Sequence, residues 1–130
     1  MRLFHLTNKK PLTIFRYSKG YYDDEGIWVD GKVTPILIEA NIQPLKYHET
    51  LQFVESDRSK KWCKLWTESL VRSEKEGNNG WGADQFYWQG DLYEVRKTQK
   101  WDMGRLDHFH AQAVRIEITP SSPPQPEAEQ

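Results

Sequence analysis

Two histidines have the spacing that most resembles a metal site. His108 and His110 are separated by one residue, so on an extended strand both imidazole rings project to the same side, as some zinc sites require. A third ligand is not evident, because Asp107 points to the other side and His5 and His48 lie in unrelated contexts. We therefore favour a polar strand face over a metal centre, and we predict no cofactor.

The sequence has a single cysteine, Cys63, between two tryptophans in a segment that alternates like a strand. A thiol in such a position is usually a small buried hydrophobe rather than a nucleophile. One cysteine cannot form an internal disulfide or a CxxC pair, which fits a reducing compartment. Stability must therefore come from packing.

Several carboxylates gather near the aromatic residues of the second half: Asp84, Asp91, Glu94 and Asp102. Paired acids beside tryptophans occur in glycosidases, where the separation of the two acids sets the mechanism. The spacing here is not diagnostic, and acids at a hairpin and its flanks are ordinary turn residues. Because the sequence also lacks a phosphate-binding glycine loop and a nucleophile elbow, we predict that the protein is not an enzyme.

Length and composition favour one polar domain. The chain has 130 residues, of which 37% are hydrophobic and 28% charged, and no apolar run approaches the roughly 20 residues of a membrane span. Residues 1–10 lack the features of a signal peptide, so we expect synthesis in a cytoplasm. A formal net charge of -1 argues against tight nucleic-acid binding, which depends on neutralising phosphates.

The charges are nevertheless unevenly distributed. Residues 1–19 include five basic and no acidic side chains, whereas residues 20–31 include four acidic and no basic ones. Pairing of Arg16 and Lys19 with Asp23 and Asp24 across a hairpin is one explanation, and we prefer it to a DNA-binding groove.

The fold class follows from aromatic content and segment length. Aromatic residues make up 13% of the chain and favour half-buried pleated surfaces, and short extended segments alternate with turn residues. We predict an all-β domain over residues 1–118, a small β-barrel or sandwich of about six to seven antiparallel strands with long loops. Residues 119–130 are rich in proline and predict a disordered tail.

Alternation and turn residues place the strands. Strands are predicted at residues 12–17, 26–29, 33–43, 60–67, 86–88, 92–98 and 108–118. Asp30 with Gly31 indicates a type I′ hairpin turn, and a second hairpin turn is expected at Gly90. Pro44 should end the third strand.

Three segments fit this pattern less simply. Residues 45–55 predict a short helix or an irregular segment. In the last strand the apolar face switches near Ala113, which predicts a β-bulge or a barrel corner. Residues 68–82 predict a long exposed loop, with a helical turn considered at its start. A loop of this length is a candidate for partner binding.

The order of these segments resembles a known family. The motifs are WVDG at 28–31, ANIQPL at 40–45, WQGDLYEV at 88–95 and HFHA at 108–111. Together they resemble the head-completion proteins of tailed bacteriophages, which are also called neck, head-closure, stopper or head–tail connector proteins. The resemblance covers residues 12–118, and the loop at 68–82 departs from it by being longer and more charged.

The resemblance implies a structural role in the virion neck. A member of this family is a small β-barrel subunit of a homo-oligomeric ring beneath the portal that closes the head after DNA packaging and offers a docking surface to the tail. The implied partners are a portal or adaptor protein on the head side and a tail-completion or tail-terminator protein on the tail side. Genomic DNA would pass through the channel without sequence-specific contact. No cofactor, reaction or membrane is implied.

If the protein forms a ring, we expect charged residues and residues in protruding loops to make the contacts between subunits. Head-to-tail contacts require one patch of each subunit to complement a different patch of the next. The candidate subunit or partner interface consists of Arg16, Lys19, Asp23, Asp24, Glu74, Lys75, Asn78, Asn79 and Trp81.

Two alternatives from other classes remain. A carbohydrate-binding β-sandwich module would use coplanar exposed tryptophans to stack on sugar rings, and an OB-type fold would stack them on bases. A catalytic domain would instead show a pocket with at least two carboxylates of shifted pKa. We expect most of the six tryptophans to lie in the core.

Overall fold

The structure is a computed structural model that describes most of the chain. The described residues are 9–18, 20–29, 31–46, 49, 59–76, 80–103 and 106–126, with the backbone alone at 101–103 and 106–107. The strands are β1 Lys10–Tyr17, β2 Tyr21–Tyr22, β3 Trp28–Val29, β4 Val33–Pro44, β5 Trp62–Thr67, β6 Gln85–Trp88, β7 Asp91–Met103 and β8 Leu106–Ile116.

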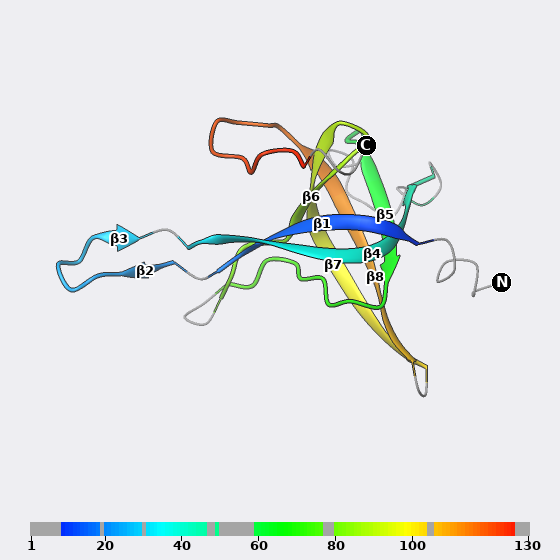
Figure 1. Ribbon diagram of the computed structural model, residues 1–130, viewed down its shortest axis with the longest axis horizontal. Helices are drawn as coiled ribbons and strands as arrows, with labels where there is room; N and C mark the ends of the chain where they lie inside the picture. Colours follow the sequence, from blue (N-terminus) through cyan, green and yellow to red (C-terminus); the bar gives the residue numbers. More distant parts are fainter. Residues whose placement is uncertain are drawn as a thin grey trace.

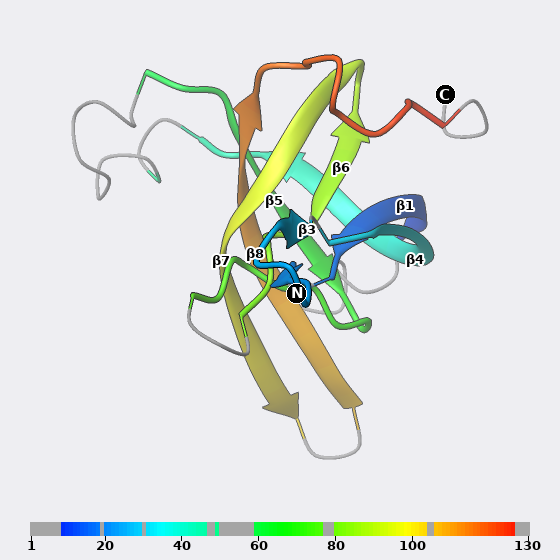
Figure 2. The same ribbon diagram turned by 90° about the vertical axis from the view of Figure 1, so that its left-hand side faces the viewer.

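Six of these strands close into an antiparallel barrel. Their order around the barrel is β1-β4-β5-β8-β7-β6, and β2 pairs with β3 in a separate two-stranded sheet (Figures 1 and 2). The prediction of a small all-β barrel is therefore confirmed. Within the described residues, the structure contains no helix whose length and apolarity would let it cross a lipid bilayer.

β1 and β4 form one long ribbon that leaves the barrel. β1 pairs with β4 from Lys10 opposite Ala40 to Tyr17 opposite Val33. Beyond this pairing, the Ser18 amide donates to the Lys32 carbonyl at 2.8 Å, and the ribbon continues into β2 and β3 (Figure 1). We call residues 20–29, at the far end of this ribbon, the arm.

The arm corrects one predicted turn. We expected the strand at 26–29 to form a hairpin with the next strand through Asp30 and Gly31, but β3 pairs with β2 and β4 pairs with β1. The reversal lies instead at residues 23–27. There the Asp23 Oδ1 accepts hydrogen bonds from the Glu25 and Ile27 amides, both at 2.9 Å, and Gly26 supplies a φ of 79°. An Asp side chain that bonds its own turn, together with a left-handed glycine, stabilises this reversal.

Exposed and buried side chains alternate over residues 37–40 of β4, although Thr34, expected on the core face, is exposed and Asn41, expected on the other face, is buried. Ile38 and Ala40 are buried on the barrel side of β4, whereas Leu37 on the other side is 71% exposed. On β5, Cys63 and Leu65 face the core. Pro44 is the last residue of β4. Most of the segment at 45–55 lies outside the described residues.

The second predicted hairpin is confirmed. β6 and β7 pair from Gln85 opposite Glu94 to Trp88 opposite Asp91. The two turn residues, Gln89 and Gly90, have φ of 53° and 85°. Left-handed angles at both central positions are those of a type I′ turn.

β7 and β8 form a second long ribbon (Figure 2). A register shift lies between Val95 and Lys97 of β7, opposite Ala113 and Gln112 of β8. We expected a bulge or a barrel corner near Ala113, and the irregularity lies at this level of the sheet, on the partner strand β7. The shift allows Ala113 to stay in the core while β7 continues beyond the barrel.

Two clusters of buried side chains hold the barrel. The inner cluster includes Phe86 and Tyr93, whose rings stack at 5.8 Å. The outer cluster lies on the opposite side of the wall and contains Phe15, Tyr87 and Leu92. The Tyr87 hydroxyl donates to the Pro123 carbonyl at 2.5 Å, so the chain after β8 packs beside this outer cluster. The division into a 1–118 domain and a disordered tail at 119–130 stays a prediction.

Tyr93 supports a prediction about stability. Its side chain is fully buried, its hydroxyl has no hydrogen-bond partner among the described residues, and burial raises its pKa to about 12. Replacing Tyr93 by Phe removes an unsatisfied polar group and should raise the free energy of unfolding by about 1 kcal/mol in urea titrations.

The pH dependence should change as well. Because the pKa of Tyr93 is higher in the folded state than the unfolded value of 10.0, the unfolded chain releases the phenolic proton at lower pH than the folded protein. The free energy of unfolding should therefore fall as the pH rises from 10.0 towards about 12. The Tyr93→Phe variant should therefore lose less stability than the wild type over this range. If the free energy of unfolding falls equally with pH in the two proteins, or if the variant is less stable at neutral pH, this account is contradicted.

Candidate subunit interface

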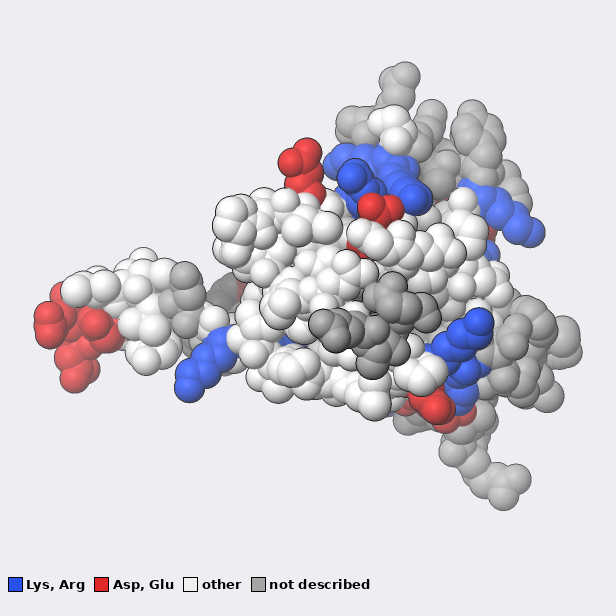
Figure 3. Space-filling view, turned by 45° about the horizontal axis from the view of Figure 1, so that its top comes forward, with Lys and Arg blue, Asp and Glu red and all other residues white. Residues whose placement is uncertain are grey.

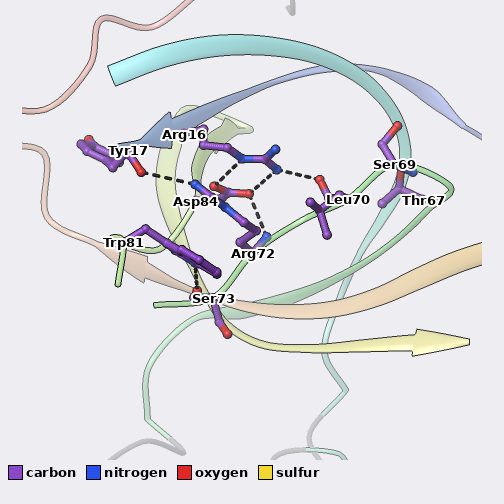
Figure 4. Close-up of polar contacts among 9 residues, drawn as sticks. All are labelled: Arg16, Tyr17, Thr67, Ser69, Leu70, Arg72, Ser73, Trp81 and Asp84. Atoms are coloured by element: carbon purple, nitrogen blue, oxygen red, sulfur yellow. Dashed lines mark hydrogen bonds and ion pairs between the residues drawn. The ribbon is translucent and has the colours of Figure 1, made fainter. Parts of the chain in front are cut away.

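A buried ion pair fastens the long loop after β5 to the end of β1. The Arg16 guanidinium contacts both carboxylate oxygens of Asp84, Nε to Oδ1 at 3.2 Å and Nη2 to Oδ2 at 2.8 Å (Figure 4). The Asp84 side chain is 0% exposed. Its Oδ2 also accepts a hydrogen bond from the Arg72 amide at 2.8 Å, and the Arg16 Nη2 donates to the Leu70 carbonyl at 2.7 Å. This charge network holds both ends of the loop against one strand.

Trp81 organises the middle of the same loop. Its indole Nε1 donates to the Ser73 carbonyl at 3.0 Å, and the Arg72 guanidinium lies 4.3 Å from the ring centroid (Figure 4). The Lys75 ammonium lies 4.9 Å from the same centroid, and the backbones of Lys75 and Trp81 exchange two hydrogen bonds. Burial, and secondarily the charge of Arg16, lowers the pKa of Arg72.

The loop is therefore less exposed than we predicted. Val71 is buried and belongs to the inner core cluster, and Ala83 is also buried. Glu74, Lys75 and Glu76 do remain exposed. The sequence suggested a solvated loop because its polar residues outnumber its apolar ones, but Val71 and the Asp84 network anchor its two ends.

The arm presents apolar side chains to solvent. Tyr22 is 70% and Trp28 51% exposed, and their rings meet edge to face at 5.0 Å. Tyr21 and Ile27 on the same arm are also more than half exposed. Next to these residues the turn carries Asp23, Asp24 and Glu25, and Figure 3 shows acidic side chains gathered at the far end of the arm.

A groove lies at the other end of β1. β1 pairs with β6 at two positions, Ile14 opposite Phe86 and Phe15 opposite Gln85, so residues 10–13 have no strand partner on that side among the described residues. The groove there has a volume of about 600 Å³. It is lined by Lys10, Pro11, Leu12, residues 40–43, residues 87–90, Gln125 and Pro126. Among the described residues of this lining, Lys10 alone is charged.

The structure separates the predicted interface residues into groups. Arg16 is half-buried and forms its ion pair with Asp84, so the predicted pairing of Arg16 with Asp23 or Asp24 is wrong. Asp23 bonds the arm's own turn, whereas Asp24 is exposed. Glu74, Lys75 and Trp81 share the loop, and Lys19, Asn78 and Asn79 lie outside the described residues.

Sequence reasoning missed two features of this surface. Asp84 was interpreted as a turn acid, and its partner Arg16 is 68 positions away in the sequence. Tyr22 was assigned to a loop, although the sequence places apolar pairs, Tyr21 with Tyr22 and Ile27 with Trp28, on both sides of the acidic triplet. That symmetry is the signal that predicts a short hairpin with an apolar stem.

The chemical candidates have structural roles. Cys63 is fully buried and burial raises its pKa far above the ordinary value, which confirms it as a buried hydrophobe. The His110 ring stacks on Trp66 at 4.1 Å, and His108 is buried. Among the described side chains, no three His, Cys, Asp or Glu groups come close enough together to hold a metal ion.

The carboxylates near the aromatic region also have assigned partners. Asp91 forms ion pairs with Lys61 at 3.0 Å and Arg115 at 3.2 Å, and the hydrogen bond from Lys61 is the main cause of its lowered pKa. Glu94 contacts Gln85 and Arg96. The side chain of Asp102 lies outside the described residues.

The tryptophans do not form a shared exposed platform within the described residues. Trp62 is buried, and Trp66, Trp81 and Trp88 are half-buried. Trp28 is the one described tryptophan that is more than half exposed, and the side chain of Trp101 is not described. A carbohydrate-binding module would instead be expected to present several coplanar rings.

Comparison with known families decides the class of the protein. A family model described as E217 collar protein gp28 matches residues 3–111, a span that runs from before β1 into the middle of β8. The chain belongs to this phage collar protein family. Among curated proteins, no match was found. The protein is therefore a structural component of the virion neck, which confirms the resemblance found in the sequence.

Proposed function

We propose that this collar protein forms a closed homo-oligomeric ring between the portal and the tail. The ring closes the head after DNA packaging and offers a docking surface to the tail. The observation that carries this proposal is the arm, which holds Tyr22 and Trp28 beyond the barrel. Exposed apolar side chains grouped on a protruding element are typical of surfaces that become buried in an assembly.

The shape of the protomer favours a ring over a two-fold dimer. A two-fold interface uses the same patch on both subunits, whereas a cyclic ring uses two different patches. The arm and the groove differ in shape, charge and position. The groove lies at the start of β1, where Lys10 lines it, whereas the arm lies beyond the other end of β1 (Figure 1). Such a protomer is suited to head-to-tail contacts.

The proposed partners follow from this position in the neck. A portal or adaptor protein would contact one face of the ring, and a tail-completion or tail-terminator protein the other. Genomic DNA would pass through the channel without sequence-specific contact. A formal net charge of -1 suits this passage, because a strongly basic lining would bind the phosphates and hinder movement of the DNA.

The predicted interface residues enter this proposal in two places. Asp23, Asp24 and Lys19 would belong to the contact made by the arm, and the residues of the loop at 68–82 to a contact with a neighbouring subunit or partner. In the loop these residues are Glu74, Lys75, Asn78, Asn79 and Trp81. Arg16 would act through Asp84, by holding this loop in position.

The charge of the arm gives a test of its part in assembly. The Asp24→Lys variant reverses an exposed charge and leaves the Asp23 carboxylate in place to stabilise the turn. We expect it to weaken ring assembly several-fold at low salt and much less at high salt, since exposed charges are screened. Sedimentation velocity of assemblies at two salt concentrations measures this effect. Identical sedimentation of variant and wild type at low salt would count against it.

The function itself is tested by removal and restoration of the chain. Particles assembled without it should contain packaged heads that lack tails and lose DNA, and addition of the purified wild-type chain should restore tail attachment. Electron microscopy counts tailed and tailless heads, and a nuclease assay measures released DNA. Tailed particles that retain DNA in the absence of the chain would refute the proposal.

A further inference from the structure

The arm has more apolar surface than the protomer itself covers. Tyr21, Tyr22 and Trp28 of the two short strands, and Ile27 just before β3, are each more than half exposed. Complete burial of one such side chain contributes about 1.5–3 kcal/mol, so an assembly that covers several of them is strongly favoured.

The groove at the start of β1 has the properties of a receiving site for an extended segment. Its volume of about 600 Å³ lies within the range of sites that bury a ligand or a partner's side chains. Leu12, Ile42 and Trp88 contribute apolar surface to its lining. Within the part of the chain that the structure describes, the backbone of residues 10–13 lacks a strand partner on the β6 side, and such an edge can accept hydrogen bonds from an added strand.

Charge and position match the arm to this groove. The turn of the arm carries Asp24 and Glu25, both exposed, and the charged residue among the described lining of the groove is Lys10. Within a protomer the two features cannot meet. They are separated by at least the length of β1, which has eight residues and spans roughly 25 Å as an extended strand.

We propose that the arm of each copy is seated in the groove of the next copy around the ring. Tyr22 and Trp28 bury their rings against the groove, and the acidic turn lies beside Lys10. The occupant of the groove is thus a second copy of this chain. This inference rests on the proposed ring and adds which two surfaces form the repeated contact.

Chemical cross-linking in assembled particles tests this contact. The full-length chain carries Asp24→Cys on the arm and Lys10→Cys at the groove, and a short bifunctional maleimide joins nearby thiols. Cys63 is 0% exposed and does not compete. We expect a ladder of cross-linked dimers, trimers and larger species that contain only this chain. A second pair, Asp24→Cys with Gln125→Cys, keeps Lys10 and should give the same ladder.

The matched control pairs Asp24→Cys with Lys97→Cys. Lys97 is exposed on β7 and does not line the groove, so this pair should give no ladder. If microscopy shows the chain in the neck but both groove pairs cross-link no better than the control, the arm lies elsewhere and the inference is wrong. Cross-links from Asp24→Cys to another neck protein would overturn it equally. If microscopy shows no copies of the chain in the neck, the proposed function itself fails.

Discussion

Replacement of Asp84 by alanine is expected to lower the free energy of unfolding by about 3–5 kcal/mol. The change leaves the Arg16 guanidinium half-buried without its carboxylate and removes the acceptor of the Arg72 amide. A loss of this size is a large part of the stability of a small domain. Urea denaturation followed by tryptophan fluorescence measures it.

The Asp91→Ala variant is the matched control for this prediction. Asp91 also binds two cationic side chains, Lys61 and Arg115, but they are about half exposed. Exposed ion pairs contribute at most about 1 kcal/mol, so this variant should remain close to the wild type. Equal losses for the two variants would show that the buried network is not what holds the loop. A double variant, Arg16→Met with Asp84→Leu, should recover much of the stability, because no buried charge is left unpaired.

The second large effect concerns assembly rather than folding. The double variant Tyr22→Ser with Trp28→Ser should lower incorporation of the chain into particles by tenfold or more, because the proposed ring contact would lose two buried side chains. Its barrel should remain folded, since neither residue belongs to the core clusters. Quantitative immunoblotting of purified particles measures incorporation, and circular dichroism verifies the fold.

Another exposed apolar residue provides the comparison for this variant. Ile118 is 56% exposed and lies after β8, outside the arm and outside the groove lining. The Ile118→Ser variant should be incorporated at the level of the wild type. If it is reduced as much as the arm variant, general loss of apolar surface explains the effect. If the arm variant is incorporated normally, the arm makes no contact that assembly needs.

The sequence predicts local structure well where apolar and exposed residues alternate regularly along a strand. Alternation in β4 places Ile38 and Ala40 in the core and Leu37 outside, and the structure agrees. Gly90 marks a turn because adjacent left-handed angles are tolerated there. These features depend on neighbouring residues alone, which is why they can be derived without coordinates.

Features that depend on distant partners could not be derived in the same way. Asp84 resembles any turn acid until the barrel brings it to Arg16, 68 positions away. Asp30 and Gly31 favour a hairpin turn locally, so the sequence predicts that the strands on either side of them pair. In the structure the strand that follows, β4, pairs with β1 instead. The switch of the apolar face is visible in the sequence of β8, but the register shift that accommodates it lies on the partner strand β7.

The architecture connects these observations to the neck of the virion. A closed barrel leaves few free edges, and the charge network at Asp84 makes the adjacent loop part of the same rigid unit. The arm then extends from a firm base, because its strands continue directly from β1 and into β4. A rigid body with a protruding arm and a distant groove can repeat the same contact around a closed ring.

Electron microscopy of the neck in purified particles tests the central claim most directly. The account predicts a closed ring of copies of this chain between portal and tail, in which each copy extends residues 20–29 onto the groove beside Lys10 of the next. A neck in which the chain is present as separate subunits that do not touch one another would contradict it.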